Sequence, residues 1–322
     1  MSGWKILMGL GALGAMTETG IAVYLFRRTM LRQNTSSERT QEMAGTDWEQ
    51  YIPKIREKKQ WIMKQDYSHE WIESGDGLKL HGMFFPCEGA KKTILCLHGY
   101  SSSGMNDFSS IGAMYLSMGY NLLIVDHRAH GKSEGEYIGF GCLDRYDVKR
   151  WIRHLNQNLV PGGEIILHGI SMGAATAVMT AGLCLPGNVK GVIADCAFSS
   201  PWEVFSHVLK STYHLMPLPI MTVTDAIARQ KAGYGFRECD AREEVKKAEV
   251  PFLFIHGDAD TFVPSYMTRQ IYEACKCEKD LLIVPGAGHA EAYYKDTEIY
   301  EQKVRAFLKK GFGESHEDKI RA

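Results

Sequence analysis

Gly169-Ile170-Ser171-Met172-Gly173 is the stretch of this sequence that decides the fold. The residues before it, 164–168, are mostly apolar and predict a short buried strand. The small and apolar residues after it, 174–179, predict the start of a helix. A serine between a strand and a helix lies on a sharp, strained turn that exposes its hydroxyl group. Glycines flank the serine because larger side chains would clash where the strand meets the helix. The pattern therefore predicts a nucleophilic serine at the edge of a sheet.

An alternation of strands and helices extends on both sides of this turn. The predicted strands are His69–Glu73, Lys79–Phe85, Thr93–His98, Asn121–Asp126, Glu164–His168, Val189–Asp195, Pro251–His256 and Asp280–Val284. Helices are predicted between the later strands, near 106–118, 142–158, 172–184, 266–276 and 296–310. Only a turn at Gly75-Asp76-Gly77 separates the first two strands, which predicts an antiparallel hairpin. The expected fold class is α/β, with a mostly parallel eight-stranded sheet covered by helices on both faces.

The domain organisation follows from the segments that do not fit this alternation. Residues 66–312 are predicted to form the main domain, followed by a polar tail at 313–322. Within that domain, residues 199–242 lie between two core strands and are rich in aromatic and apolar residues, which predicts a small helical cap. Residues 33–65 are predicted to be a linker followed by an amphipathic helix. This helix packs on the catalytic body or on a membrane surface, and we favour packing on the body.

The first 32 residues contain an apolar run that predicts a membrane anchor. Residues 4–26 are long enough to span a bilayer, although Glu18 and two threonines interrupt them. Arg27, Arg28 and Arg32 follow the run, so the positive-inside rule places the catalytic domain in the cytoplasm. A cleaved signal peptide and an interfacial amphipathic helix are the alternatives. The expected localisation is therefore membrane-anchored, with a transmembrane helix in this segment and the membrane as a partner.

Composition excludes several other classes of function. The chain has 322 residues, with 37 Lys and Arg against 38 Asp and Glu, and its net charge is −1. No basic stripe with interleaved aromatic residues is present, so we expect no nucleic-acid partner. The eight cysteines are scattered, and the one close pair, Cys275 and Cys277, lacks the second pair that a zinc site needs. We expect no metal and no organic cofactor, and the free thiols favour a reducing compartment.

A nucleophilic serine needs a base within hydrogen-bonding distance and an acid that orients the base. His289 lies in a glycine-rich loop after the last predicted strand, and Asp258 and Asp260 follow the strand before it. Asp195 also ends a strand and is a further candidate acid. In a parallel sheet these strand ends meet at one edge, and the chain order Ser…Asp…His is typical of this kind of turn. The backbone N–H groups of Met172, which follows Ser171, and of Tyr100 are candidates for an oxyanion hole.

These motifs together resemble the α/β-hydrolase superfamily. The matching residues are His98-Gly99-Tyr100, Asp126-His127-Arg128-Ala129-His130-Gly131-Lys132-Ser133, Gly169 to Gly173, His256-Gly257-Asp258-Ala259-Asp260 and Gly288-His289. The chain looks most similar to single-domain hydrolases of the serine aminopeptidase S33 type, many of which are described as esterases. The resemblance covers about residues 68–311 and implies the α/β-hydrolase fold. It also implies that Asp260, the last residue of the H-G-x-x-D motif, is the acid. One departure is Ala129, where the family pattern has glycine.

The function expected from these residues is a carboxylesterase-like serine hydrolase that cleaves an ester bond through an acyl-enzyme. Ser171, His289 and Asp260 would be catalytic, and Tyr100 and Met172 would form the oxyanion hole. The substrate would be a small-molecule or lipid-like acyl compound. A peptidase or aminopeptidase, a thioesterase and a lipase use the same chemistry and remain alternatives. Outside enzymes, an inactive membrane-bound binding module or a membrane scaffold would explain the N-terminal segment.

Overall fold

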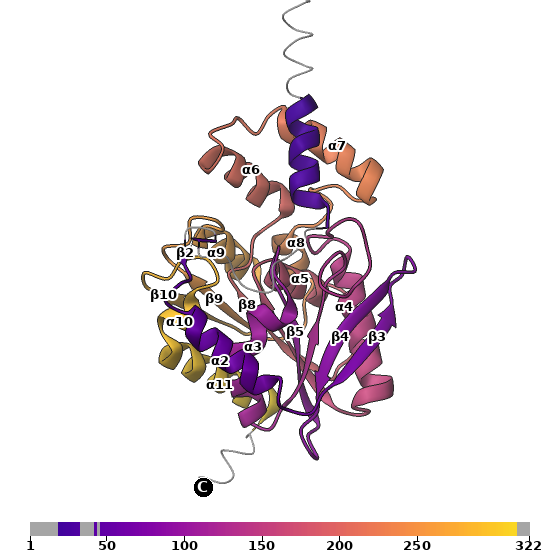
Figure 1. The fold of residues 1–322 in the computed structure, drawn as a ribbon, viewed down its shortest axis with the longest axis vertical. Coiled ribbons are helices and arrows are strands. Elements are labelled where there is room, and N and C mark those ends of the chain that lie inside the picture. The colour runs from indigo at the N-terminus through magenta and orange to yellow at the C-terminus, as the bar shows by residue number, and fades with distance from the viewer. Residues whose placement is uncertain (1–18, 33–41, 44–45, 314–322) are drawn as a thin grey trace, which may run out of the picture.

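A mixed eight-stranded sheet forms the centre of the computed structural model, which describes residues 19–32, 42–43 and 46–313 (Figure 1). Across the sheet the strands are β10 (Lys279–Val284), β9 (Phe252–Gly257), β8 (Val189–Asp195), β7 (Glu164–Ile170), β5 (Lys92–Leu97), β6 (Asn121–Val125), β4 (Lys79–Phe85) and β3 (Ser68–Glu73). The β3–β4 and β4–β6 pairs are antiparallel, and all the other pairs are parallel. This arrangement confirms the fold class predicted from the sequence, including the antiparallel hairpin at the edge.

Helices cover both faces of the sheet, because successive side chains of each strand point to opposite faces. In β5, Leu95 and Leu97 belong to one apolar cluster, whereas Ile94 and Cys96 belong to the other. The first face carries α4 (Asp144–His154), the π-helical turn η1 (Leu155–Leu159), α5 (Met172–Ala181), α8 (Ala241–Val245) and α9 (Ser265–Ala274). The second face carries α2 (Ile52–Ile62), α3 (Gly104–Ser117), α10 (Ala292–Lys295) and α11 (Thr297–Phe312). The site described below lies where the parallel strands end, between these two layers.

The segment before the sheet packs on the second face. A short pair of strands, β1 (Glu42–Met43) and β2 (Thr46–Asp47), precedes α2, which lies along α3. Ile62 is fully buried there, and the Lys59 ammonium group donates a hydrogen bond to the side-chain oxygen of Asn106 at 2.9 Å. The amphipathic helix expected within residues 33–65 therefore contacts the body of the protein. Residues 33–41 and 44–45 of that segment lie outside the described residues.

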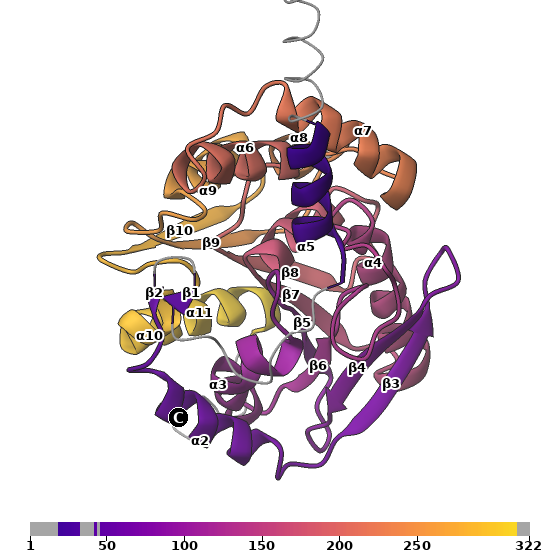
Figure 2. The same cartoon turned by 45° about the horizontal axis from the view of Figure 1, so that its top comes forward.

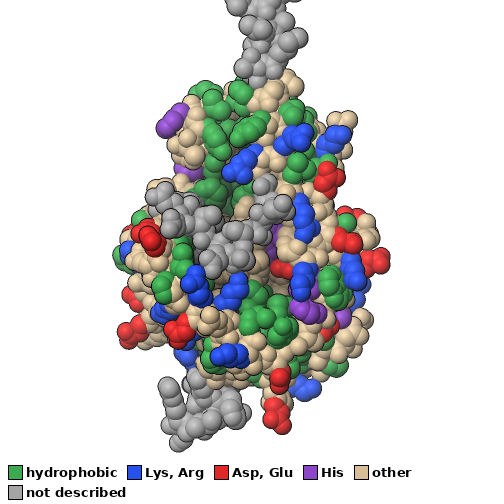
Figure 3. All heavy atoms as spheres, viewed as in Figure 1, with side chains coloured by type: hydrophobic (Ala, Val, Ile, Leu, Met, Phe, Trp, Pro, Cys, Tyr) green, Lys and Arg blue, Asp and Glu red, His purple; other side chains and the backbone are tan. Residues whose placement is uncertain are grey.

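Two helices between β8 and β9 form a cap over the sheet edge. They are α6 (Pro201–Ser211) and α7 (Ile220–Ala232), and Figure 2 shows them above the ends of the strands. The start of α6 is fixed by Ser200, whose hydroxyl accepts a hydrogen bond from the Glu203 N–H at 3.2 Å, with proline at the first helical position. Hydrophobic side chains also gather on the outer surface of this part of the molecule (Figure 3). The exposed ones include Val23, Tyr24, Tyr213, Met216 and Leu218.

The prediction of a transmembrane helix in the first 32 residues is wrong. None of the helices in the described ranges is both long enough and apolar enough to cross a membrane. Residues 19–30 form a helix, here called the N-terminal helix, that lies between α6 and α7 (Figures 1 and 2). Its buried side chains are Ala22, Leu25, Phe26 and Met30, whereas Val23 and Tyr24 are exposed. In a membrane anchor these apolar residues would face lipid, but one side of this helix packs on the cap. Residues 1–18 of the expected anchor lie outside the described residues.

The predicted membrane-anchored localisation depends on that transmembrane helix, so it is wrong as well. The arginines read as a positive-inside signal include Arg32, whose guanidinium donates hydrogen bonds to the carbonyl oxygens of Ser133 and Gly131 at 2.6 and 2.5 Å. The Arg32 N–H also donates to the Glu136 carbonyl at 2.8 Å. This arginine therefore ties the N-terminal helix to the loop after β6. A membrane-anchored, cytoplasm-facing arrangement and a membrane partner have no support in the described residues.

Candidate active site

Ser171 stands at the turn between β7 and α5, as the sequence predicts. Its φ is 55° and its ψ is −114°, a conformation that L-residues rarely adopt. The turn is possible because glycines stand on both sides. A Cβ at Gly169 would overlap the Gly173 carbonyl, and a Cβ at Gly173 would overlap the Leu97 carbonyl. The Ser171 N–H donates to the Asp195 carbonyl at 2.8 Å, so β8 holds the turn from the other side. The hydroxyl group therefore has a fixed position at the sheet edge.

His289 comes from the loop after β10 and lies directly against Ser171. Its Nε2 is 2.8 Å from Ser171 Oγ, and its ring is almost fully buried. The carboxylate of Glu291 holds this loop, because it accepts hydrogen bonds from the Gly288 N–H and the Tyr51 hydroxyl, both at 2.6 Å. Tyr51 precedes α2 and is far away in the sequence, so no local pattern indicated its contribution. The loop is thus braced by the segment that precedes the sheet.

Asp260 lies on the other side of the His289 ring. Its Oδ2 is 2.7 Å from His289 Nδ1, and its Oδ1 accepts hydrogen bonds from the N–H groups of Phe262 and Val263 at 3.0 and 2.8 Å. His256 Nε2 approaches the same Oδ2 at 3.1 Å. Burial by itself would raise the pKa of Asp260, but the nearby His289 and His256 outweigh burial and hold this pKa well below its ordinary value. The carboxylate is therefore charged and accepts the Nδ1–H of His289, which leaves Nε2 to accept the serine proton.

The two other candidate acids have different partners. Asp258 is exposed, and its carboxylate accepts a hydrogen bond from the Gly286 N–H at 2.6 Å. Asp195 is fully buried at the end of β8, and it accepts a hydrogen bond from the Tyr300 hydroxyl at 3.0 Å. Burial raises the pKa of Asp195 to about 6, and the Tyr300 hydrogen bond only partly offsets this. The structure brings Asp260, and neither rival, to His289.

The two backbone N–H groups named as oxyanion donors belong to residues beside Ser171. Met172 is the first residue of α5, so its N–H has no acceptor within the helix. Tyr100 follows Gly99, and a Cβ added to Gly99 would lie 3.4 Å from Ser171 Cβ. The Gly99 N–H donates to the buried Asp107 carboxylate at 2.7 Å, which fixes this loop. Tyr100 and Met172 both line the pocket above Ser171.

His98 and His130, which also lie in the matching motifs, bond to backbone carbonyl groups and not to the site. His98 Nδ1 donates to the Gly99 carbonyl at 2.7 Å, and its Nε2 accepts a hydrogen bond from the His127 N–H at 3.1 Å. His130 Nδ1 lies 2.9 Å from the Arg128 carbonyl. These contacts support the turn after β6, where Ala129 takes a φ of 59° in place of the usual glycine.

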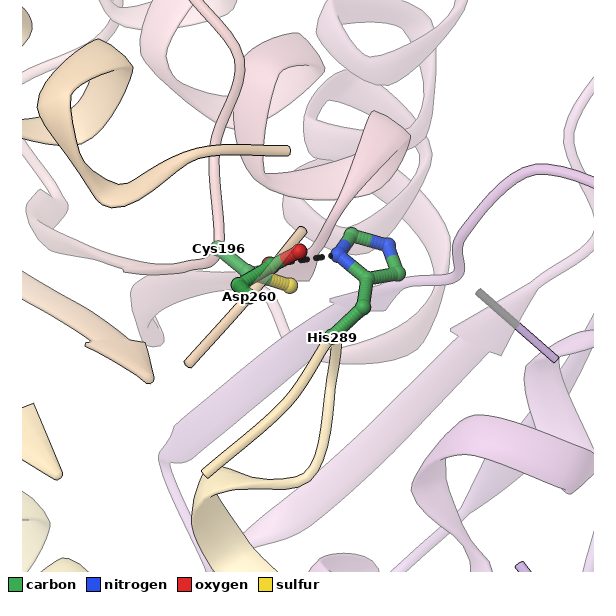
Figure 4. A group of neighbouring side chains, drawn as sticks. All are labelled: Cys196, Asp260 and His289. Atoms are coloured by element: carbon green, nitrogen blue, oxygen red, sulfur yellow. Dashed lines mark hydrogen bonds and ion pairs between the residues drawn. The ribbon is translucent and has the colours of Figure 1, made fainter. Parts of the chain in front are cut away.

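Cys196 is the residue of this site that the sequence did not indicate. Within the described part of the chain, Cys196, Asp260 and His289 are the group of potential metal ligands whose donor atoms lie within 4.8 Å of one another (Figure 4). However, Asp260 and His289 are already hydrogen bonded to each other, and burial raises the pKa of the Cys196 thiol well above its ordinary value. A metal needs the thiolate, so this arrangement favours a hydrogen-bonded pair with a packed thiol beside it.

A pocket of about 380 Å³ opens above Ser171 and His289. Its walls are mostly aromatic and aliphatic side chains, and Arg28, Thr29 and Ser101 are the polar ones. The apolar lining residues are Tyr100, Phe140, Met172, Phe198, Val204, Phe205, Val208, Tyr213, Phe262 and Val263. A concave apolar site with a few convergent polar groups is the usual form of a small-molecule site. Arg28 and Thr29 come from the N-terminal helix, which the sequence had assigned to a membrane anchor.

The chain is similar in sequence and structure to known proteins. The model of the Alpha/beta hydrolase family matches residues 94–299. The uncharacterised protein YqkD of Bacillus subtilis (strain 168) is 31% identical over 237 residues, which cover 74% of this chain and 77% of that protein. The alpha/beta hydrolase domain-containing protein WAV2 of Arabidopsis thaliana is 24% identical, with 76% and 79% covered.

Among solved structures, the esterase Pf2001 of Pyrococcus furiosus superposes with a TM-score of 0.64 at 25% identity. That match covers 79% of this chain and 94% of the esterase. An esterase from Exiguobacterium antarcticum, at 19% identity and a TM-score of 0.57, shares the fold over 75% of this chain and 100% of that chain. These similarities do not distinguish the S33 type from its relatives, so that finer assignment stays a prediction. The family match and the relative above 30% identity show that this chain belongs to the Alpha/beta hydrolase family.

Proposed function

We propose that this protein is a serine hydrolase that cleaves a carboxylic ester with an apolar acyl group. The observation that carries the proposal is the continuous chain of hydrogen bonds Ser171–His289–Asp260 at the floor of an apolar pocket. Membership of a hydrolase family and the likeness to an esterase structure support the reaction class. The substrate is a small molecule, because a concave, mostly apolar pocket of about 380 Å³ is the usual form of a small-molecule site.

In the first half of the reaction, Ser171 Oγ attacks the ester carbonyl as its proton passes to Nε2 of His289. Asp260 holds the Nδ1–H and stabilises the imidazolium that forms, without itself taking the proton. The other carboxylate oxygen of Asp260, Oδ1, already accepts hydrogen bonds from two backbone N–H groups. The Asp260 side chain therefore cannot rotate away from the His289 ring. The negative charge that develops on the carbonyl oxygen is stabilised by the N–H groups of Tyr100 and Met172.

In the second half, the imidazolium returns its proton to the leaving alkoxide, and the alcohol departs. Water then attacks the acyl-enzyme, with His289 as the base, and Ser171 is regenerated with release of the carboxylic acid. The acyl group occupies the pocket during both halves. Its walls of Phe198, Phe205 and Phe262 favour a hydrocarbon chain over a polar peptide backbone, whose N–H and C=O groups would be left without partners.

Two measurements test the proposal. A fluorophosphonate probe should label the wild-type protein at Ser171, identified by peptide mass spectrometry, and should fail to label the Ser171→Ala variant. Wild-type protein should hydrolyse p-nitrophenyl butyrate faster than the matched p-nitroanilide and thioester, and Ser171→Ala should lose about 10³-fold or more in kcat. Folded wild-type protein that neither reacts with the probe nor turns over the ester would overturn the proposal. A preference for the anilide or the thioester would reassign the substrate class.

A further inference from the structure

A second, smaller chamber adjoins the pocket above Ser171. This chamber has a volume of about 40 Å³ and lies between the N-terminal helix, α6 and α7. It shares Thr29, Phe205, Val208 and Tyr213 with the main pocket, so the two chambers have a common wall. Its remaining lining residues are Leu25, Leu209, Met221 and Thr224. The smaller chamber therefore lies beside the main pocket, on the side of the N-terminal helix and α7.

The smaller chamber is suited to hydrocarbon. The side chains of Leu25, Leu209 and Met221 are buried. The two threonine hydroxyls that line the chamber donate within their own helices, from Thr29 to the Leu25 carbonyl at 2.7 Å and from Thr224 to the Ile220 carbonyl at 2.9 Å. The protons of both hydroxyls are therefore already used within the helices, and neither is left to donate to a ligand. A cavity needs roughly 10–15 Å³ to hold one water-sized group, so this chamber has room for about three such groups.

The N-terminal helix is a fixed wall of this chamber. At its C-terminal end the Met30 carbonyl accepts a hydrogen bond from the Ile138 N–H at 2.8 Å. The Tyr234 hydroxyl contacts Met30 Sδ at 3.7 Å and donates to the Ile138 carbonyl at 2.6 Å. The Tyr100 hydroxyl donates to the Arg28 carbonyl at 3.3 Å, which links the helix to the loop beside Ser171. The position of Leu25 relative to the site is thus set by contacts at both the cap and the sheet edge.

We propose that the small chamber receives the end of an unbranched acyl chain and that Leu25 and Met221 set the chain length the enzyme accepts. This inference rests on the proposed ester hydrolysis and names its substrate class as a straight-chain acyl ester. The acyl carbonyl lies at Ser171, the first carbons fill the main pocket, and the last few methylenes enter between the three helices. Each methylene that gains a buried position raises kcat/KM about fourfold, until the chain end meets Leu25 and Met221.

The test measures kcat/KM for p-nitrophenyl esters from acetyl to dodecanoyl with full-length protein. Leu25→Phe and Met221→Phe fill the chamber from opposite sides, and Leu25→Ala enlarges it. Both phenylalanine variants should shift the optimum to shorter chains and lower kcat/KM for longer esters by about tenfold, with the acetyl ester changed by less than about twofold. Leu25→Ala should shift the optimum to longer chains. Val23→Phe, at an exposed position of the same helix, is the matched control and should keep the wild-type profile.

Binding to the Ser171→Ala protein separates this inference from the proposed function. Calorimetric titration with straight-chain fatty acids should show affinity rising with length, and adding Leu25→Phe should truncate the rise at the same length as in the kinetic profile. If the protein does not hydrolyse esters but this binding pattern is found, the inference that the chamber limits the length of the bound chain is still supported. Profiles that stay parallel to wild type in both phenylalanine variants would overturn the inference. Equal losses for acetyl and long esters would overturn it too, because they would indicate damage to the site and not to the chamber.

Discussion

Asp260 provides the sharpest test of the site at the scale of single residues. Asp260→Asn should lower kcat by about 10³- to 10⁴-fold with little change in KM, because an amide no longer holds the His289 tautomer that accepts the serine proton. Asp258→Asn changes a neighbouring exposed carboxylate that accepts a hydrogen bond from the Gly286 N–H, and should cost less than about threefold. Steady-state kinetics with p-nitrophenyl butyrate and thermal melts of both variants make the comparison. A larger loss in the Asp258 variant would mean that the acid is misassigned.

The chain order, the glycine-flanked turn and the glycine-rich loop made Ser171 and His289 candidates, and the structure places their side chains 2.8 Å apart. These patterns left Asp195, Asp258 and Asp260 as candidates for the residue that orients His289. Only the resemblance to the family motif favoured Asp260. The groups that support the pair could not be predicted in this way. Glu291 and Tyr51 are 240 residues apart in the sequence. The thiol of Cys196 lies beside the site because of the backbone path after β8. Such contacts depend on tertiary packing, which leaves no periodic signal in the sequence.

At the scale of elements, the N-terminal helix is where sequence reasoning failed. An apolar run of this length predicts a lipid-spanning helix when only hydropathy is considered. A helix packed between two cap helices also buries apolar side chains, as Leu25 and Phe26 are here, and the sequence of one segment does not reveal whether lipid or protein covers them. The cap itself was predictable, because residues 199–242 interrupt the strand–helix alternation with aromatic side chains. What the alternation could not show is that the third helix of the cap region comes from the other end of the chain.

Met30→Ala tests whether this helix is docked on the cap in solution. The Met30 side chain is fully buried, so its truncation should lower the free energy of unfolding by about 2–5 kcal/mol. Val23→Ala removes a smaller, partly exposed side chain from the same helix and should change stability by less than about 0.5 kcal/mol. Urea denaturation followed by circular dichroism compares the two. Equal, small effects would show that the helix does not rest on α6 and α7.

At the scale of the whole molecule, buried histidines and buried carboxyl groups have opposite effects on how the stability of the fold depends on pH. Burial lowers the pKa of His168 and of His130 to about 3, and burial raises the pKa of Asp195 and of Asp147 to about 6. Between about pH 4 and pH 6 the unfolded chain protonates the histidines, whereas the folded protein protonates the carboxyls. These proton uptakes have opposite signs in the dependence of stability on pH. Stability should therefore change little across this window.

One group of hydrogen-bonded side chains makes these opposite effects testable. The Tyr300 hydroxyl lies 3.3 Å from His168 Nε2 and donates to Asp195 Oδ2 at 3.0 Å. In the wild type, His168 costs stability as pH falls below 6.5, because only the unfolded state binds its proton. Asp195 adds stability as pH falls below about 6, because the folded state binds a proton first. His168→Asn should therefore gain on the wild type as pH falls from 6 to 4, and Asp195→Asn should lose, each by about 1.4 kcal/mol per pH unit. Urea denaturation at half-unit pH steps measures both differences. If the stability curves of both variants run parallel to the wild-type curve over this pH range, then His168 and Asp195 titrate normally in the folded protein. These two side chains would then be accessible to water.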